Sequence, residues 1–171
     1  FPGYHLGTEI TFEDDAIVTA AADGDSGDDG FLNANDPVTP GSTFTPIMSV
    51  TATNPAFLNH GYLNVWVDWN DNGIFEEASY ELIPGSGVYV QEHKIKNSIV
   101  YDGINNPNND LLSFSVPNGL EDGDYAIRFR FTHNESVTTA LGEALSGEVE
   151  DYLLHVISGD PSYDYGDAPT S

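Results

Sequence analysis

The sequence predicts an all-β protein, an antiparallel β-sandwich of about seven to nine strands with long acidic loops. Seven short apolar runs follow one another with turn residues between them, a spacing that is typical of a sandwich or a barrel. Two runs, at residues 61–69 and 124–133, alternate apolar with polar side chains, as half-buried antiparallel strands do. The other runs span residues 44–53, 80–83, 88–101, 111–116 and 149–158.

These runs indicate one domain. Gly and Asn residues that tolerate positive φ separate them, as at residues 70–73 and 117–119. We expect a single module over residues 1–158, in which the first 42 residues form loops around one or two edge strands. Residues 159–171 lack apolar alternation and are interpreted as a linker or a donor segment that contacts the next unit.

The charge of the chain restricts its partners. It has 28 acidic against 4 basic residues, a formal net charge of -24. Such a charge repels phosphate backbones and anionic lipid, so the sequence argues against nucleic-acid binding and membrane insertion and favours cations. There is no cysteine, and no apolar run approaches the roughly 18 residues of a membrane helix. We expect an extracellular or cell-surface protein.

The strongest local signal is a calcium-type loop. Asp68, Asn70 and Asn72 occupy positions 1, 3 and 5, Gly73 occupies position 6, and the Ile74 carbonyl stands at position 7. Position 12 is a serine rather than the bidentate glutamate of an EF-hand, so further ligands must come from elsewhere. The alternative is an Asn-Asp-Asn-Gly hairpin turn without metal.

A second acidic group opens the last run. Alternation places Glu148 and Glu150 on one face of this strand and Asp151 on the other. Adjacent carboxylates repel unless a cation or an arginine neutralises them. Two readings therefore stay open: calcium ligation, or pairing with Arg128 and Arg130, which we expect on an exposed face of the neighbouring strand.

Two further features are candidate sites. Four aspartates lie within the eight residues 23–30, which also contain glycine and serine, and form either an oxygen-rich calcium site or a solvated loop; they are Asp23, Asp25, Asp28 and Asp29. Asn134 lies in an Asn-Glu-Ser sequon just after a predicted strand, where glycosylation is expected if the loop is exposed. The chain contains no nucleophile elbow, phosphate loop or dinucleotide fingerprint, and its five histidines lack ligand-like spacing, so we expect no catalysis.

Three segments together resemble the GEVED domain of large bacterial surface proteins. They are residues 62–75, 125–130 and 147–152, and the likeness extends over about residues 40–158. In that family residues 164–169 are similar to the start of a repeat, and residues 4–30 to the stretch that follows it. The resemblance implies tandem units and a chain that ends with the opening of the next unit.

Three functional classes follow from these observations. The favoured one is a structural, calcium-binding building block of an extracellular fibre or cell-surface adhesin, which assembles head to tail with neighbouring copies. The contact residues predicted for this assembly are Tyr163, Tyr165, Asp167 and Pro169. The alternative is a carbohydrate-binding module that uses aromatics near the calcium loop, with Tyr62, Trp66 and Trp69 to stack on sugar rings. An accessory domain of a secreted hydrolase is the third class.

Overall fold

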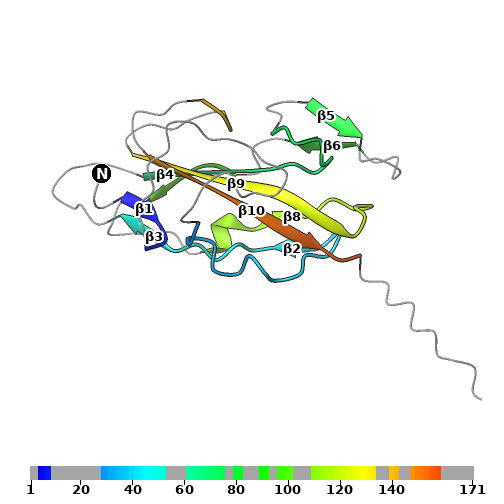
Figure 1. Cartoon of the computed structure of the whole chain (residues 1–171), viewed down its shortest axis with the longest axis horizontal. Helices are drawn as coiled ribbons and strands as arrows, with labels where there is room; N and C mark the ends of the chain where they lie inside the picture. The colour runs from blue at the N-terminus through cyan, green and yellow to red at the C-terminus, as the bar shows by residue number, and fades with distance from the viewer. Residues whose placement is uncertain are drawn as a thin grey trace, which may run out of the picture.

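The computed structural model contains ten strands and one short 3₁₀ helix among the residues that it describes (Figure 1). The described residues are 4–8, 28–52, 61–75, 79–82, 89–92, 96–101, 109–133, 139–142 and 147–158. All strand pairings between named strands are antiparallel. The all-β class that the sequence predicts is therefore confirmed.

A four-stranded sheet forms the centre of the molecule. Its order is β10 (Gly147–Val156), β9 (Gly123–His133), β4 (Gly61–Val67) and β7 (Lys96–Tyr101). The two long strands, β9 and β10, pair residue by residue without a register shift from Thr132 opposite Gly147 onward. Two of the predicted alternating runs thus become the inner strands β4 and β9.

Three two-stranded sheets surround this centre. They pair β1 (Tyr4–Leu6) with β3 (Val50–Ala52), β2 (Thr43–Phe44) with β8 (Phe114–Ser115), and β5 (Ser79–Leu82) with β6 (Tyr89–Glu92). In Figure 1 the first two lie along one side of the large sheet, and β5–β6 lies away from them. The 3₁₀ helix η1 (Asn109–Leu112) precedes β8.

The sequence predicted longer strands than the structure contains. The run at 44–53 splits into β2 and β3, because Pro46 between them has no amide hydrogen to donate to a ladder. Within the run at 88–101 the structure describes β6 at 89–92 and β7 at 96–101. β1 lies within the first 42 residues, where one or two edge strands are expected, but its three residues are too few to show alternation, so the sequence does not predict its position.

The main core lies between the large sheet and the layer of β1, β2 and β8. Residues at alternate positions of β9, such as Ile127, Phe129 and Phe131, are fully buried against it. Phe31 packs edge-on against Phe44, with ring centroids 6.2 Å apart, and so links the coil before β2 to this core. The contributing side chains from β4 and β10 are Leu63, Val65, Val67, Leu154 and Val156.

The opposite face of the large sheet is also covered. Trp66 is fully buried there with Phe75 and Ala140, and the Arg128 guanidinium lies 5.1 Å from the centre of the Phe75 ring. Arg128 is 0% and Arg130 2% exposed. The expectation that both arginines lie on an exposed face is therefore wrong, because residues 139–142 pack over them.

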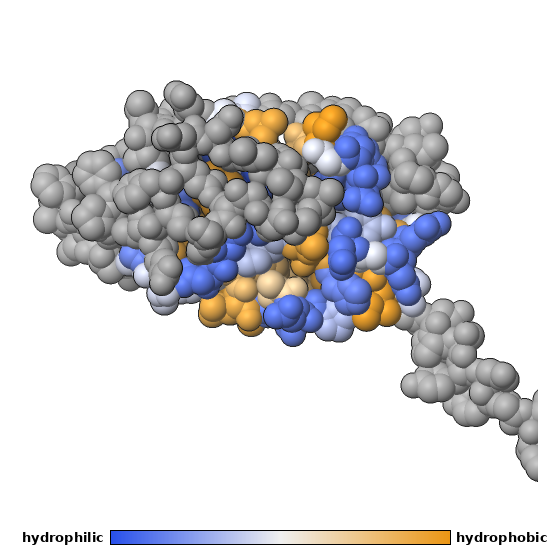
Figure 2. All heavy atoms as spheres, viewed as in Figure 1, coloured by the Kyte–Doolittle hydropathy of each residue, from blue (hydrophilic) through white to orange (hydrophobic). Residues whose placement is uncertain are grey.

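The surface of the described residues is largely hydrophilic in the view of Figure 2, with separate small apolar areas. The large apolar side chains that remain exposed are Leu32, Ile47, Ile74, Leu111, Leu141 and Ile157. No helix in the described part of the chain has the length and apolar character needed to cross a membrane.

Candidate functional site

The first half of β10 presents polar side chains to both faces of the sheet. Glu148 stands opposite Phe131 and Glu150 opposite Phe129, so both glutamates point into the apolar core. Asp151 stands opposite Arg128 on the other face. The predicted division of these three carboxylates between two faces is found in the structure, and the three do not converge on one point.

The two glutamates bind main-chain amides of the N-terminal part of the chain. Glu148 Oε2 accepts from the Leu6 amide at 2.6 Å. Glu150 Oε1 accepts from Gly30 at 3.2 Å and from Asp29 at 3.4 Å. Buried carboxylates need such donors, since an unsatisfied buried charge is very costly. The two side chains thus fasten β1 and the stretch around residue 30 to β10.

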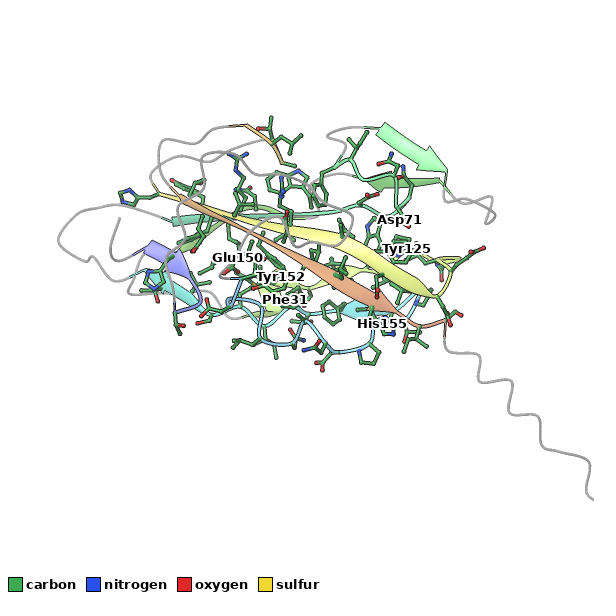
Figure 3. All side chains as sticks on the ribbon, in the orientation of Figure 1. Phe31, Asp71, Tyr125, Glu150, Tyr152 and His155 are labelled. Atoms are coloured by element: carbon green, nitrogen blue, oxygen red, sulfur yellow. The ribbon has the colours of Figure 1, made fainter. Side chains whose placement is uncertain are left out.

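Tyr152 extends this contact by one more residue (Figure 3). Its hydroxyl accepts from the Phe31 amide at 3.0 Å and donates to Glu150 Oε2 at 3.1 Å. Its ring packs edge-on against Phe31, with centroids 5.2 Å apart. Burial and the nearby Glu150 charge raise the pKa of Tyr152, so the hydroxyl keeps its proton and remains a donor.

Two glycines are required by these close approaches. A Cβ at Gly30 would overlap both Glu150 carboxylate oxygens and the Leu6 Cβ. A Cβ at Gly147, where φ is +149°, would overlap the Phe131 carbonyl oxygen. Gly147 therefore lets β10 start directly beside the β9 backbone, and Gly30 lets the chain pass directly under the carboxylate.

On the outer face, Asp151 forms an ion pair with Arg128. The guanidinium donates from Nε at 2.7 Å and from Nη2 at 2.5 Å to the two carboxylate oxygens. Its Nη1 donates to the Ala140 carbonyl at 3.1 Å. This forked geometry is available to arginine and not to lysine. Of the two open readings, pairing with an arginine is thus found for Asp151.

Arg130 holds the loop that covers this face. Its Nη1 donates to the carbonyls of Thr139 at 2.8 Å and Leu141 at 2.9 Å, and its Nη2 donates to Gly142. With the bond from Arg128 to Ala140, four successive carbonyls accept from two guanidinium groups. The loop therefore depends on both arginines, a contact that no local pattern in the sequence predicts.

Comparison with known protein families matches the part of the chain that contains β4, β9 and β10. The family model described as GEVED domain matches residues 62–155, more than half of the chain. The chain belongs to the GEVED domain family. The resemblance drawn from the sequence motifs is thereby confirmed. A search of curated proteins and one of solved structures found no match. The amides bound by Glu148 and Glu150 belong to Leu6 and Gly30, which lie outside the matched residues. Strand β10 therefore contacts parts of the chain that the family model does not cover.

The second candidate site of this GEVED domain is the loop after β4. Asp68 accepts from the amides of Asn72 at 3.2 Å and Gly73 at 2.7 Å, and Asn70 Oδ1 accepts from the same Asn72 amide at 3.0 Å. Asn72 Oδ1 accepts from Ile74 at 2.8 Å. The three side-chain oxygens therefore turn toward the inside of the loop. Asp71 and Gly73 adopt positive φ values of 55° and 79° to close it.

The chemistry of this loop fits a hard cation. Asp68 is 2% exposed, and burial raises its pKa, while hydrogen bonds from the loop amides oppose that rise. The amides of Asn72 and Gly73 bond to the carboxylate, which has about four acceptor positions, so capacity remains for an ion. Carboxylate and amide oxygens are the ligands that Ca²⁺ prefers. Asp68, Asn70 and Asn72 would hold the ion, which would supply the positive charge that offsets burial.

The same end of the sheet carries other acidic side chains. Burial raises the pKa of Tyr125, and the charges of Asp71, Glu121 and Asp122 raise it further. The Tyr125 hydroxyl donates to the Glu121 carbonyl at 3.1 Å. Acidic residues from the loop after β4 and from the turn before β9 thus lie near the Tyr125 hydroxyl. Figure 3 shows Asp71 beside Tyr125. Within the part of the chain that the structure describes, no group of three His, Cys, Asp or Glu side chains is arranged to hold a metal ion.

The aromatic residues near this loop are mostly buried. Trp66 is 0% and Trp69 2% exposed. Trp69 packs in the core against Phe114 and Tyr125, with ring centroids 6.1 Å from each. Tyr62 is half-buried. The two tryptophans therefore stabilise the fold and do not form an exposed platform for sugar rings.

The remaining predicted sites are partly described. Asp29 accepts from the Thr8 amide at 2.9 Å and joins β1 to the stretch around residue 30. Asp28 is half-buried beside it. The other predicted residues lie outside the described part of the chain, namely Asp23, Asp25, Asn134, Tyr163, Tyr165, Asp167 and Pro169. Sequence analysis did not identify Tyr152 and Gly30 as site residues. The signal for Tyr152 was its place in the Gly-Glu-Val-Glu-Asp-Tyr motif, and that for Gly30 was its place in the stretch 4–30 that resembles the family.

Proposed function

We propose that this GEVED domain is a non-catalytic structural module of an extracellular fibre or cell-surface protein. One observation carries the proposal: the polar residues of the family motif support the fold. Glu148 and Glu150 bind main-chain amides, and Asp151 binds Arg128. Carboxylates engaged in this way fix the positions of segments and loops, which is the requirement of a building block.

The module binds calcium at the loop formed by Asp68, Asn70, Asn72 and the Ile74 carbonyl. The support is the inward orientation of three side-chain oxygens and the burial of the Asp68 carboxylate. A cation also reduces the self-repulsion of a chain with a net charge of -24. On β10, Glu148 and Glu150 are interpreted as acceptors of main-chain amides and Asp151 as the partner of Arg128, so calcium is assigned to the loop after β4 alone.

Calorimetric titration with calcium, together with thermal unfolding, tests this site. Extracellular modules bind calcium with dissociation constants of about 10⁻⁴ to 10⁻³ M, and calcium at ten times that value stabilises by about 1.4 kcal/mol. Asp68→Asn should abolish both the binding heat and the rise in Tm. Asp36→Asn, which removes the same charge from an exposed turn, should retain them. An equal response of the wild type and Asp68→Asn to calcium would refute the site.

The module also assembles head to tail through its C-terminal segment. The support is the similarity of residues 164–169 to the start of a family unit, and the position of β7 at one end of the sheet order. An edge strand of this kind accepts an added segment through main-chain hydrogen bonds. A chain without residues 159–171 should fold with an unchanged Tm and fail to form long oligomers in light scattering. Filaments that persist after the deletion would contradict the contact.

A further inference from the structure

The contact between β10 and the N-terminal part of the chain is made by acidic side chains. Leu6 binds Glu148, while Asp29 and Gly30 bind Glu150. These two stretches are also joined to each other, because Asp29 accepts from Thr8. The family motif therefore holds two segments, which are hydrogen-bonded to each other, against the sheet through hydrogen bonds to two neighbouring carboxyl groups.

The polar groups around Glu150 are mostly acidic. On β10 it faces Glu148 and Tyr152, and on β9 its direct partner is Phe129. The stretch at 28–31 contains Asp28 and Asp29. The charge of Asp28 raises the pKa of Tyr152, and the Asp29 amide bonds to Glu150. β1 carries His5 next to Leu6. Arg128 and Arg130 bind Asp151 and the loop at 139–142 on the opposite face of the sheet.

This environment disfavours two negative charges. Glu150 is fully buried, and burial followed by the charge of Glu148 raises its pKa to about 8. Hydrogen bonds from Tyr152 and from the two amides lower the pKa less than burial raises it. When the contact is formed, Glu150 therefore keeps its proton up to a higher pH. When the contact is released, the carboxyl group loses the proton near its ordinary pKa of 4.5.

We propose that Glu148 and Glu150 form a pH-sensitive latch, which holds β1 and residues 28–31 on β10 while the pair carries a proton and loosens when both carboxyl groups are charged. The latch is a property of β10 and is independent of the calcium loop. Below pH 4.5 the contact has its full strength, because the carboxyl is protonated in both the docked and the released state. Between pH 4.5 and about 8 the equilibrium constant for release of the contact rises about tenfold per pH unit, and above pH 8 this rise levels off.

Amide hydrogen exchange of the whole chain measures this opening directly. After correction for intrinsic exchange rates, the opening constant of the Leu6, Gly30 and Phe31 amides should rise about fiftyfold between pH 6 and pH 8. Glu150→Gln keeps a carbonyl acceptor without a charge, so its opening constant should stay within about threefold over this range. Glu121→Gln, which removes a charge from an exposed position, should behave as the wild type.

A second measurement requires no variant. Carbon-detected NMR titration of the glutamate carboxyl groups should show one group that titrates near pH 8 in the wild type. The latch is excluded if every glutamate titrates below pH 6, or if the three amides open equally at pH 6 and pH 8. A pH dependence that is unchanged in Glu150→Gln would exclude it as well, because a group other than Glu150 would then be the cause.

Discussion

Arg128 and Asp151 face each other directly across β9 and β10, and each of the two carboxylate oxygens accepts a hydrogen bond from the guanidinium. Both side chains are buried, Arg128 at 0% and Asp151 at 7% exposure. The hydrogen bonds to water that both groups lose on burial are therefore replaced by the forked contact and by the bond from Arg128 to the Ala140 carbonyl. It connects the family motif to the loop that covers the outer face of the sheet.

Arg128→Lys should lower the free energy of unfolding by about 2 kcal/mol, because lysine keeps the charge and loses the fork and the contact with Phe75. Urea denaturation measures the change. Asp36→Asn, at an exposed turn, is the control and should cost less than about 0.5 kcal/mol. A loss of that small size in Arg128→Lys would mean that the fork is unimportant for stability.

Gly30→Ala should destabilise the protein by about 1–3 kcal/mol, since the new methyl group overlaps the Glu150 carboxylate and Leu6. Gly123→Ala provides the matched control, because its Cβ would meet only Tyr125 at an ordinary 3.9 Å. Thermal unfolding should show a lowered Tm in the first variant alone. Equal Tm values for the two variants would contradict the close passage of the chain under Glu150.

Gly147→Ala should cost about 3 kcal/mol, because it combines a positive φ with a collision against the β9 backbone. Gly142→Ala separates the two causes: φ there is +91° and nothing lies within 4 Å of the added Cβ. In that variant the positive φ alone should lower the free energy of unfolding by about 1 kcal/mol. Denaturant unfolding of both variants gives the difference, and a larger loss at Gly142 than at Gly147 would refute the steric argument.

Tyr152→Phe should move the titration of Glu150 to higher pH. The Tyr152 hydroxyl donates to the carboxylate and so lowers the pKa of Glu150, which is about 8 with the hydroxyl present. Without this donor, the pH range over which stability falls should extend upward. NMR titration of Glu150 detects the change, and Tyr125→Phe, the same deletion at the other end of the sheet, should leave it unaltered. A downward movement in Tyr152→Phe would contradict the assigned hydrogen bond.

The sequence by itself determined the all-β class, the family and the faces of the strands. Alternation at Ile127, Phe129 and Phe131 identifies the core side of β9, because side chains of a strand point to opposite faces with a period of two. The same rule separates Glu150 from Asp151 correctly. The Asp68–Asn70–Asn72 spacing also predicts correctly that a tight loop follows β4.

Only the tertiary structure decided what each polar residue contacts. Alternation places Glu150 on a face but does not state that this face is the core, or that residues 29 and 30, which lie 121 and 120 positions away, supply its donors. Likewise, Arg130 is buried because a loop folds over it from outside the strand pattern. The physical reason is that hydrogen bonds and charge pairs are satisfied by whatever groups the chain brings near in space, and local periodicity carries no information about those long-range partners.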